Sequence, residues 1–185
     1  SLLDVVRPDP RLPDDISISL TTNGTLLTPA VVDNIRKSAI AKIGLSLESA
    51  DRERFNLNRG GPFFGRFMAG LRSLKGIQNR FNETIYKDLA VTMLSDCIRN
   101  EDDIDAVYRL GAEHDIHGIT FQFPISAGDN AAALRESEYI FEIAQGIARA
   151  SLRYPKIATF MQYRRLLLDY CNKKYGANIS GGKTT

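Results

Sequence analysis

The sequence contains few cysteines and no long apolar run, and both shortages exclude classes of protein. Cys97 and Cys171 are the only cysteines among its 185 residues. Two thiols so far apart do not form the disulfide framework of a small secreted domain. No stretch reaches the length of a membrane span, and the opening residues, SLLDVVRPDP, lack the layout of a signal peptide. We therefore expect a cytoplasmic protein without a membrane partner.

The sequence also lacks an evident catalytic pair. Its two histidines, His114 and His117, stand three residues apart near the end of a predicted helix. This spacing could hold a metal ion, but no further ligand follows at a convincing distance, and helix-terminal histidines are more common. No nucleophile has an obvious partner. We predict no metal site here and expect a cofactor to supply any chemistry.

Length and composition are those of one globular domain with a sizeable core. The chain is 43% hydrophobic and 25% charged, with a net charge of +2. The charge is uneven, because eight basic residues and only one acidic residue, Asp169, follow from Arg149 onward. Such a tail could contact an anionic partner but more often forms the solvated side of helices, so we do not expect nucleic acid as a partner.

A strand pattern near the start of the chain leads into a helix. Apolar residues alternate with Ser, Thr and Asn from Ile16 to Asn23, which is the period of a β-strand. Gly24 ends the run, and Thr28 before Pro29 is a hydroxyl N-cap with proline at the first helical position. In α/β proteins the carboxyl end of such a strand is where ligands bind.

The alternation of strand and helix recurs along the chain and predicts a parallel sheet with right-handed crossovers. We expect residues 1–15 to be the end of a helix and a proline-rich connection, 16–150 a βα barrel core, and 151–185 a basic helical extension. The elements expected after the first strand are a helix over 29–38, a strand over 42–48, a polar loop over 49–62, a helix over 63–74, a strand over 89–94, a helix capped by Asn100, a strand over 118–124, and helices over about 131–150 and 156–174.

Three of the four predicted strands have one apolar and one polar face. Strands covered by helices on both faces read as continuous apolar runs, so the polar face must contact water or a ligand. A partial barrel with a ligand-bearing lumen meets this demand, and so does a sheet that shows its polar face to water. The polar residues at the strand ends suit a ribose, an amino acid or a base edge; they are Thr21, Asn23, Ser46, Glu48, Thr92 and Gln122.

Several segments, in this order, resemble the radical S-adenosylmethionine enzymes. They are Leu20–Thr28 (LTTNGTLLT), Ile43–Ser49 (IGLSLES), Asn58-Arg59-Gly60 with Phe63, Asn100, and Phe121–Pro124 (FQFP). That family has a Thr-Asn-Gly strand, then a Ser-x-Asp strand and an Arg-Gly turn. The resemblance covers about residues 16–126. It implies an α/β fold, a partial (βα)6 barrel of which this chain holds strands three to six, followed by C-terminal helices.

The resemblance also implies a function. The family binds S-adenosylmethionine and cleaves it reductively to a 5′-deoxyadenosyl radical, which here would act on a small-molecule or peptide substrate. The electron would come from a donor such as flavodoxin or ferredoxin. The family's Cys-x3-Cys-x2-Cys loop and Gly-Gly-Glu edge are absent from this sequence. We therefore expect the ligands of the 4Fe-4S cluster to lie outside this chain, and the chain alone to be inactive.

The resemblance assigns roles to single residues. Ser46 matches the family serine that contacts S-adenosylmethionine, Glu48 stands where the family has Asp, and Asn23 lies on the matching strand edge. These three are expected to bind the cofactor. The residues expected to face the substrate are Thr21, Arg59, Thr92 and Gln122, with Arg59 as the partner of a carboxylate or other anion.

Two other interpretations of the polar edge are open. A non-catalytic half-barrel would use it to bind a nucleotide or a protein partner. An ordinary βα-barrel hydrolase should place a carboxylate or histidine at several strand ends, and only Glu48 meets that condition. We therefore rank the hydrolase last.

Overall fold

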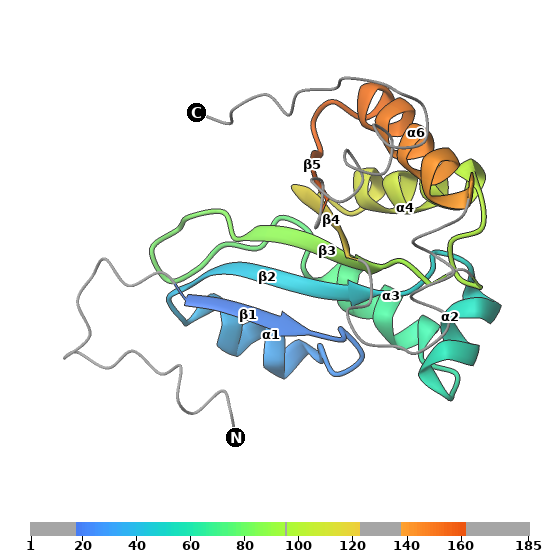
Figure 1. The fold of residues 1–185 in the computed structure, drawn as a ribbon. Helices are drawn as coiled ribbons and strands as arrows, with labels where there is room; N and C mark the ends of the chain where they lie inside the picture. The colour runs from blue at the N-terminus through green and yellow to red at the C-terminus, as the bar shows by residue number, and fades with distance from the viewer. Residues whose placement is uncertain (1–17, 95, 123–137, 162–185) are drawn as a thin grey trace.

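The computed structural model describes residues 18–94, 96–122 and 138–161, and a five-stranded sheet in the order β1-β2-β3-β4-β5 forms its centre (Figure 1). Every neighbouring pair of strands is parallel. The strands are β1 (Ile18–Thr22), β2 (Ile40–Leu47), β3 (Tyr86–Thr92), β4 (Gly118–Gln122) and β5 (Ala158–Met161). This sheet confirms the predicted α/β class, while its closure into a partial barrel stays a prediction.

Helices connect the successive strands. They are α1 (Pro29–Arg36), α2 (Arg52–Arg59), α3 (Phe64–Ser73), α4 (Glu101–Glu113) and α6 (Glu138–Arg153). In Figure 1, α1 lies beneath β1 and β2, and α6 lies beside α4. No helix in the described ranges is long and apolar enough to cross a membrane.

The predicted N-caps are confirmed in the structure. The Thr28 side chain accepts a hydrogen bond from the Val31 N–H at the start of α1, and Pro29 follows it. The Asn100 side chain accepts from the Asp103 N–H at 3.1 Å, and acidic residues fill the first turn of α4. Both caps satisfy backbone donors that the first turn of a helix leaves free. Negative charge near that end also interacts favourably with the helix dipole.

The prediction of a polar loop over 49–62 is wrong, because this segment contains α2. The Asp51 side chain caps α2 by accepting from the Arg54 N–H at 2.9 Å. Gly60 ends the helix in the left-handed conformation, with φ of +68°, which a residue without Cβ adopts freely. Phe55 is the buried residue of α2. One apolar anchor in eight residues gives too weak a periodicity for sequence reasoning to recognise.

The prediction of a helix over 156–174 is wrong at its start, because residues 158–161 form β5. Pro155 follows α6 closely, and proline cannot continue a helix. The chain then pairs with β4, beginning with the Ala158 N–H, which donates to the His117 carbonyl at 2.8 Å. The predicted helix over 131–150 is present as α6 from Glu138 onward.

Several predictions fall on residues outside the described part of the chain. These are the helix end and proline-rich connection before residue 16, the start of the first strand, residues 123–126, and everything after residue 161. The division into a core ending at residue 150 and a basic extension stays a prediction.

The two faces of the sheet differ as the sequence predicts. On one face Leu45, Leu89 and Phe121 are fully buried, and they belong to one core with residues of the helices such as Phe67 and Val107. Burying such side chains is the main driving force for folding. The opposite face carries the polar residues, and the site described next lies at its carboxyl edge.

Candidate functional site

The register of the sheet brings the predicted polar residues of the strands onto one face. Thr21 on β1 pairs with Gly44 on β2, and Ser46 lies two residues further along β2 on the same face. On the neighbouring strands, Thr92 of β3 pairs with Gln122 of β4. Thr92 and Gln122 are the last residues of their strands. Hydroxyls and an amide therefore line the carboxyl edge of four adjacent strands, where ligands bind in parallel sheets.

Asn23 stabilises the turn that follows β1. Its side-chain oxygen accepts from the Thr25 N–H at 3.1 Å and from the Thr25 hydroxyl at 2.8 Å. Gly24 has φ of +73°, and a Cβ there would lie 2.8 Å from the Phe67 ring. The turn is thus pressed against α3 and admits no larger residue. Asn23 remains exposed, and its amide N–H groups make no hydrogen bond to a described residue.

Arg59 links the end of α2 to the end of β2. Its Nε donates to Glu48 Oε2 at 2.7 Å, and its Nη2 donates to the Ser46 carbonyl at 2.9 Å. The guanidinium also lies over the Phe55 ring, 5.2 Å from its centre. Arg59 and Glu48 therefore face each other at the same strand end. The sequence did not predict this contact.

The ion pair leaves hydrogen-bonding capacity for a ligand. A guanidinium has five N–H donors, and two of those on Arg59 are used in the bonds to Glu48 and Ser46. Oε1 of Glu48 makes no hydrogen bond to a described residue. The pair can thus offer donors to an anion and an acceptor to a hydroxyl at the same place.

The residues that hold α2 in position were missed by sequence reasoning. Asn56 Oδ1 accepts from the Phe64 N–H at 2.9 Å and so caps the start of α3. Phe55 packs against Phe64 and Phe67, with ring centres 5.4 and 5.2 Å away. The signal that could have revealed α2 is Asp51 as N-cap with Gly60 after the last helical residue.

A second ion pair ties α2 to the start of α4. Both Nη atoms of Arg54 contact the Asp103 carboxylate, Nη1 at 2.6 Å from Oδ2, and Nη1 also donates to the Cys97 carbonyl at 3.0 Å. Burial acts to raise the pKa of Asp103, but the hydrogen bonds from Arg54 and from the Arg99 N–H outweigh it and hold that pKa below its ordinary value. The charged pair thus fixes α2 and the start of α4 to each other.

The histidines and the described cysteine do not form a metal site. His114 is the C-cap of α4, and His117 accepts the Lys87 N–H on Nδ1 at 3.0 Å. Cys97 is fully buried, and burial raises the pKa of its thiol to about 12. Within the described ranges, no group of three or more His, Cys, Asp or Glu residues could hold a metal ion.

The chain is similar to an enzyme that depends on S-adenosylmethionine. It is 28% identical over 129 residues to the AdoMet-dependent heme synthase of Methanosarcina barkeri (strain Fusaro / DSM 804). This match covers 67% of the chain and 34% of the heme synthase. No family model matches the sequence.

The fold is similar to that of SuiB from Streptococcus suis. The structure of SuiB bound to S-adenosylmethionine matches 88% of this chain with a TM-score of 0.55 and 15% identity. The structure of SuiB bound to its precursor peptide SuiA matches equally well. In both cases the chain covers 36% of SuiB. It therefore spans about a third of the length of the relatives it matches.

The sequence match and the shared fold agree with the motifs of the strand ends. The Thr-Asn-Gly segment lies at the end of β1, the Ser-x-Glu segment at the end of β2 and the Arg-Gly pair at the end of α2. Together these similarities support the resemblance of the chain to the radical S-adenosylmethionine enzymes.

Proposed function

We propose that the carboxyl edge around Ser46, Glu48 and Arg59 binds S-adenosylmethionine, and that the five strands of this chain form part of a radical S-adenosylmethionine barrel. The observation that carries this proposal is the position of Arg59, whose guanidinium contacts both Glu48 and the Ser46 carbonyl at the end of β2. A ligand at this edge meets a hydroxyl, a carboxylate and a guanidinium together.

These groups fit the polar parts of S-adenosylmethionine. Oε1 of Glu48 is available to accept from a ribose hydroxyl, and the remaining N–H groups of Arg59 are available for the carboxylate of the methionine part. The Ser46 side chain lies on the polar face, beside Gly44, and both donates and accepts. Asn23 is restricted to donating, because its oxygen is used by Thr25.

The described residues do not fit a 4Fe-4S cluster. Such clusters are held by several thiolates, and Cys97 is a single buried thiol that stays protonated. The chemistry that S-adenosylmethionine supplies in this family is one-electron cleavage of its C5′–S bond to methionine and a 5′-deoxyadenosyl radical. We infer that the cysteine ligands of the cluster lie outside this chain. The electron for the cleavage would come from a separate donor protein, a flavodoxin or ferredoxin.

The proposed substrate is a small molecule or a peptide that contacts the rest of the polar face. Thr21, Thr92 and Gln122 provide hydroxyl and amide groups across three strands. The same fold in SuiB was solved with the precursor peptide SuiA, which supports a peptide as one substrate class. In this arrangement the cofactor lies at the β2 end and the substrate spreads over the neighbouring strands.

Calorimetric titration of the chain with S-adenosylmethionine tests the proposal. We expect saturable binding that Ser46→Ala weakens about two- to tenfold, the effect of one hydrogen bond, and that Arg59→Ala weakens further. Arg66→Ala is the matched control, because Arg66 is an exposed arginine that lies over the Phe63 ring instead of the β2 end.

Two results would contradict the proposal. One is the absence of saturable binding to the folded wild-type chain. The other is an Arg59→Ala variant that binds S-adenosylmethionine as tightly as the Arg66→Ala control. Equal affinity for adenosine and for S-adenosylmethionine would favour the non-catalytic nucleotide-binding module instead.

A further inference from the structure

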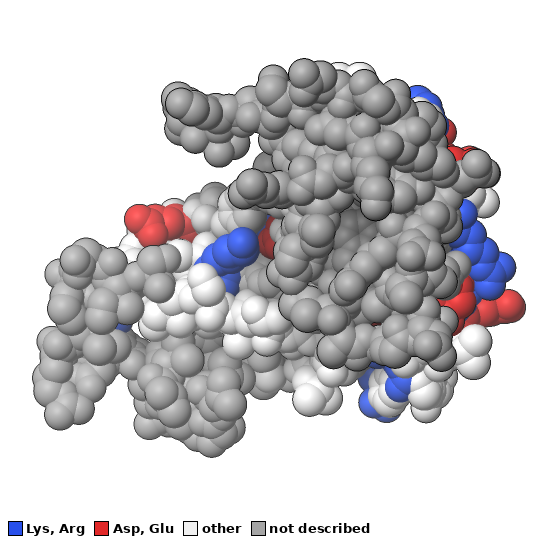
Figure 2. Space-filling view, in the orientation of Figure 1, with Lys and Arg blue, Asp and Glu red and all other residues white. Residues whose placement is uncertain are grey.

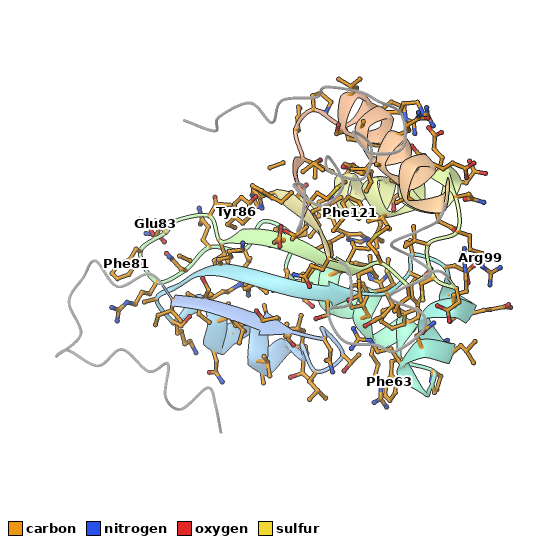
Figure 3. The ribbon with its side chains drawn as sticks, viewed as in Figure 1. Phe63, Phe81, Glu83, Tyr86, Arg99 and Phe121 are labelled. Carbon is orange, nitrogen blue, oxygen red and sulfur yellow. The ribbon has the colours of Figure 1, made fainter. Side chains whose placement is uncertain are left out.

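A second polar cluster lies on the same face of the sheet, nearer the amino ends of the strands. This Asp88 cluster consists of Lys42 on β2, Tyr86 and Asp88 on β3, and Thr120 on β4. Lys42 pairs with Tyr86 in the register of β2 and β3. Figure 3 shows Tyr86 at the start of β3, at the opposite end of the sheet from Arg99. The cluster is therefore distinct from the carboxyl edge around Arg59.

Two glycines flank Asp88 on the neighbouring strands. Asp88 pairs with Gly44 on β2 and with Gly118 on β4. A Cβ at Gly118 would lie 2.4 Å from the Tyr86 hydroxyl and 2.8 Å from Asp88 Oδ1, so both oxygens lie over this glycine. A Cβ at Gly44 would come no closer than 3.5 Å to another described side chain, that of Thr21. The described residues thus leave room for a methyl group over Gly44, on the strand beside Asp88, at ordinary van der Waals distances.

Asp88 is a buried carboxyl group to which the described residues bring little positive charge. Its exposed fraction is 5%, and its described hydrogen bonds come from the Thr120 hydroxyl, at 3.0 and 3.2 Å. Burial raises the pKa of Asp88, and Thr120 and Lys42 offset this only in part. No described cation forms an ion pair with it.

The charge of Lys42 acts on Asp88, but the Lys42 ammonium lies over the Tyr86 ring and forms no ion pair with the carboxylate. Its Nζ lies 5.4 Å from the centre of the Tyr86 ring. Figure 2 shows a basic surface with a recessed acidic surface beside it, over the strands near the middle of the molecule. A desolvated carboxylate without an ion pair is costly, so a ligand that brings a positive charge gains more here than at the surface.

We propose that Asp88 binds a protonated amine of the substrate, with the Tyr86 hydroxyl as a second acceptor. An ammonium group has three N–H donors, and Asp88 Oδ1 and Tyr86 Oη converge over Gly118 to receive two of them. The inference deepens the proposed function, on which it rests, because it names a chemical group of the substrate. An anionic ligand would be repelled by the Asp88 carboxylate. A metal ion is not favoured either, because the described residues contain no group of three or more His, Cys, Asp or Glu that could hold one.

Carbon-13 NMR of the carboxyl group of Asp88, in the full chain, tests the inference with n-butylammonium as the probe and n-butanol as the uncharged control. We expect a saturable shift of the Asp88 signal with butylammonium and none with butanol. The pKa of Asp88 should fall when the amine is bound, because the cation stabilises the carboxylate. Lys42 and Tyr86 are the other titratable groups of the cluster, and their signals should be followed in the same samples.

Three variants sharpen the test. Asp88→Asn should weaken butylammonium binding by about tenfold or more, since it removes a charge-assisted hydrogen bond. Tyr86→Phe keeps the ring that stacks on His117 and should weaken binding by a smaller factor. Asp33→Asn removes an exposed aspartate of α1 and should leave binding unchanged.

The inference is wrong if butylammonium leaves the Asp88 signal of the wild-type chain unmoved, or moves it no more than butanol does. It is also wrong if a folded Asp88→Asn variant binds the amine as well as Asp33→Asn does. If Asp88→Asn does not fold, the butylammonium titration of the wild-type chain tests the inference by itself. A sample that binds S-adenosylmethionine but not the amine removes this inference only, whereas a sample that does not bind S-adenosylmethionine removes the proposed function.

Discussion

Arg59 and Glu48 connect the last residue of α2 to the residue that follows β2, through a 2.7 Å hydrogen bond from Nε to Oε2. Their side chains are only 15% and 18% exposed, so the charges are partly shielded from water. Arg59 also contacts the Ser46 carbonyl and the Phe55 ring. The ion pair thus fixes the proposed cofactor edge before a ligand binds.

Removing one partner of this pair should destabilise the protein. We expect Glu48→Ala to lower the free energy of unfolding by about 1–3 kcal/mol, between the values for exposed and for buried ion pairs. The cause is the unpaired guanidinium that remains half-buried beside Ser46. Denaturant unfolding at neutral pH measures the change.

Arg109→Ala is the control for this prediction. Arg109 pairs with Asp105 one turn away on α4, but its side chain is 61% exposed. Such a pair contributes only about 0.3–0.5 kcal/mol. If Glu48→Ala costs no more than Arg109→Ala, the pair at the β2 end does not fix that edge.

The parts of the fold that depend on local chemistry were predictable from sequence. The caps Thr28 and Asn100 act within one helical turn, and their side chains bond as the sequence indicated. The faces of the strands follow from alternation alone. β5 was not predictable in this way, because a four-residue strand forms only by pairing with β4.

The candidate site was predictable only where it follows from strand alternation. Ser46 and Thr92 lie on the polar face as expected. The contact between Arg59 and Glu48 depends on α2, a helix whose one buried anchor, Phe55, gives no clear pattern. Asp88 was missed because the predicted strand began at residue 89, whereas β3 begins at Tyr86.

The ion pair between Arg54 and Asp103 should make stability depend on pH in the acidic range. The pKa of Asp103 is lower in the folded protein than in the unfolded chain, because the hydrogen bonds from Arg54 and the Arg99 N–H outweigh burial. Its contribution is therefore present above the ordinary Asp pKa of about 3.9 and is lost as the pH falls from there through the folded value. We expect Asp103→Asn to cost about 1.5–3 kcal/mol at neutral pH, and progressively less below about pH 4.

Unfolding curves of the wild-type chain and the variant, measured from neutral to acidic pH, test this expectation. Asp102→Asn is the control, because it removes a neighbouring charge from the exposed side of α4. Its expected cost is about 0.3–1 kcal/mol, from the helix dipole alone. A difference between wild type and Asp103→Asn that stays constant on acidification would rule out the ion pair as its cause.

Leu45 and Ser46 should respond to truncation in opposite ways, because a strand directs adjacent side chains to opposite faces. Leu45 is fully buried, and its Cδ2 lies 3.3 Å from the position that a Cβ at Gly24 would take. Leu45→Ala should lower the free energy of unfolding by about 2–5 kcal/mol, the cost of a cavity in a well-packed core. Ser46→Ala should change it little.

Binding of S-adenosylmethionine should separate the two variants in the reverse sense. Ser46→Ala removes a hydrogen bond of about 0.5–1.5 kcal/mol from the proposed cofactor edge, whereas Leu45 does not reach that face. Thermal unfolding and ligand titration on both variants make the comparison. A Ser46→Ala variant that unfolds readily, beside a stable Leu45→Ala variant, would mean that β2 has the opposite register. In that case Glu48 and Gly44 would also face the core, and the edge around Arg59 would lose its carboxylate.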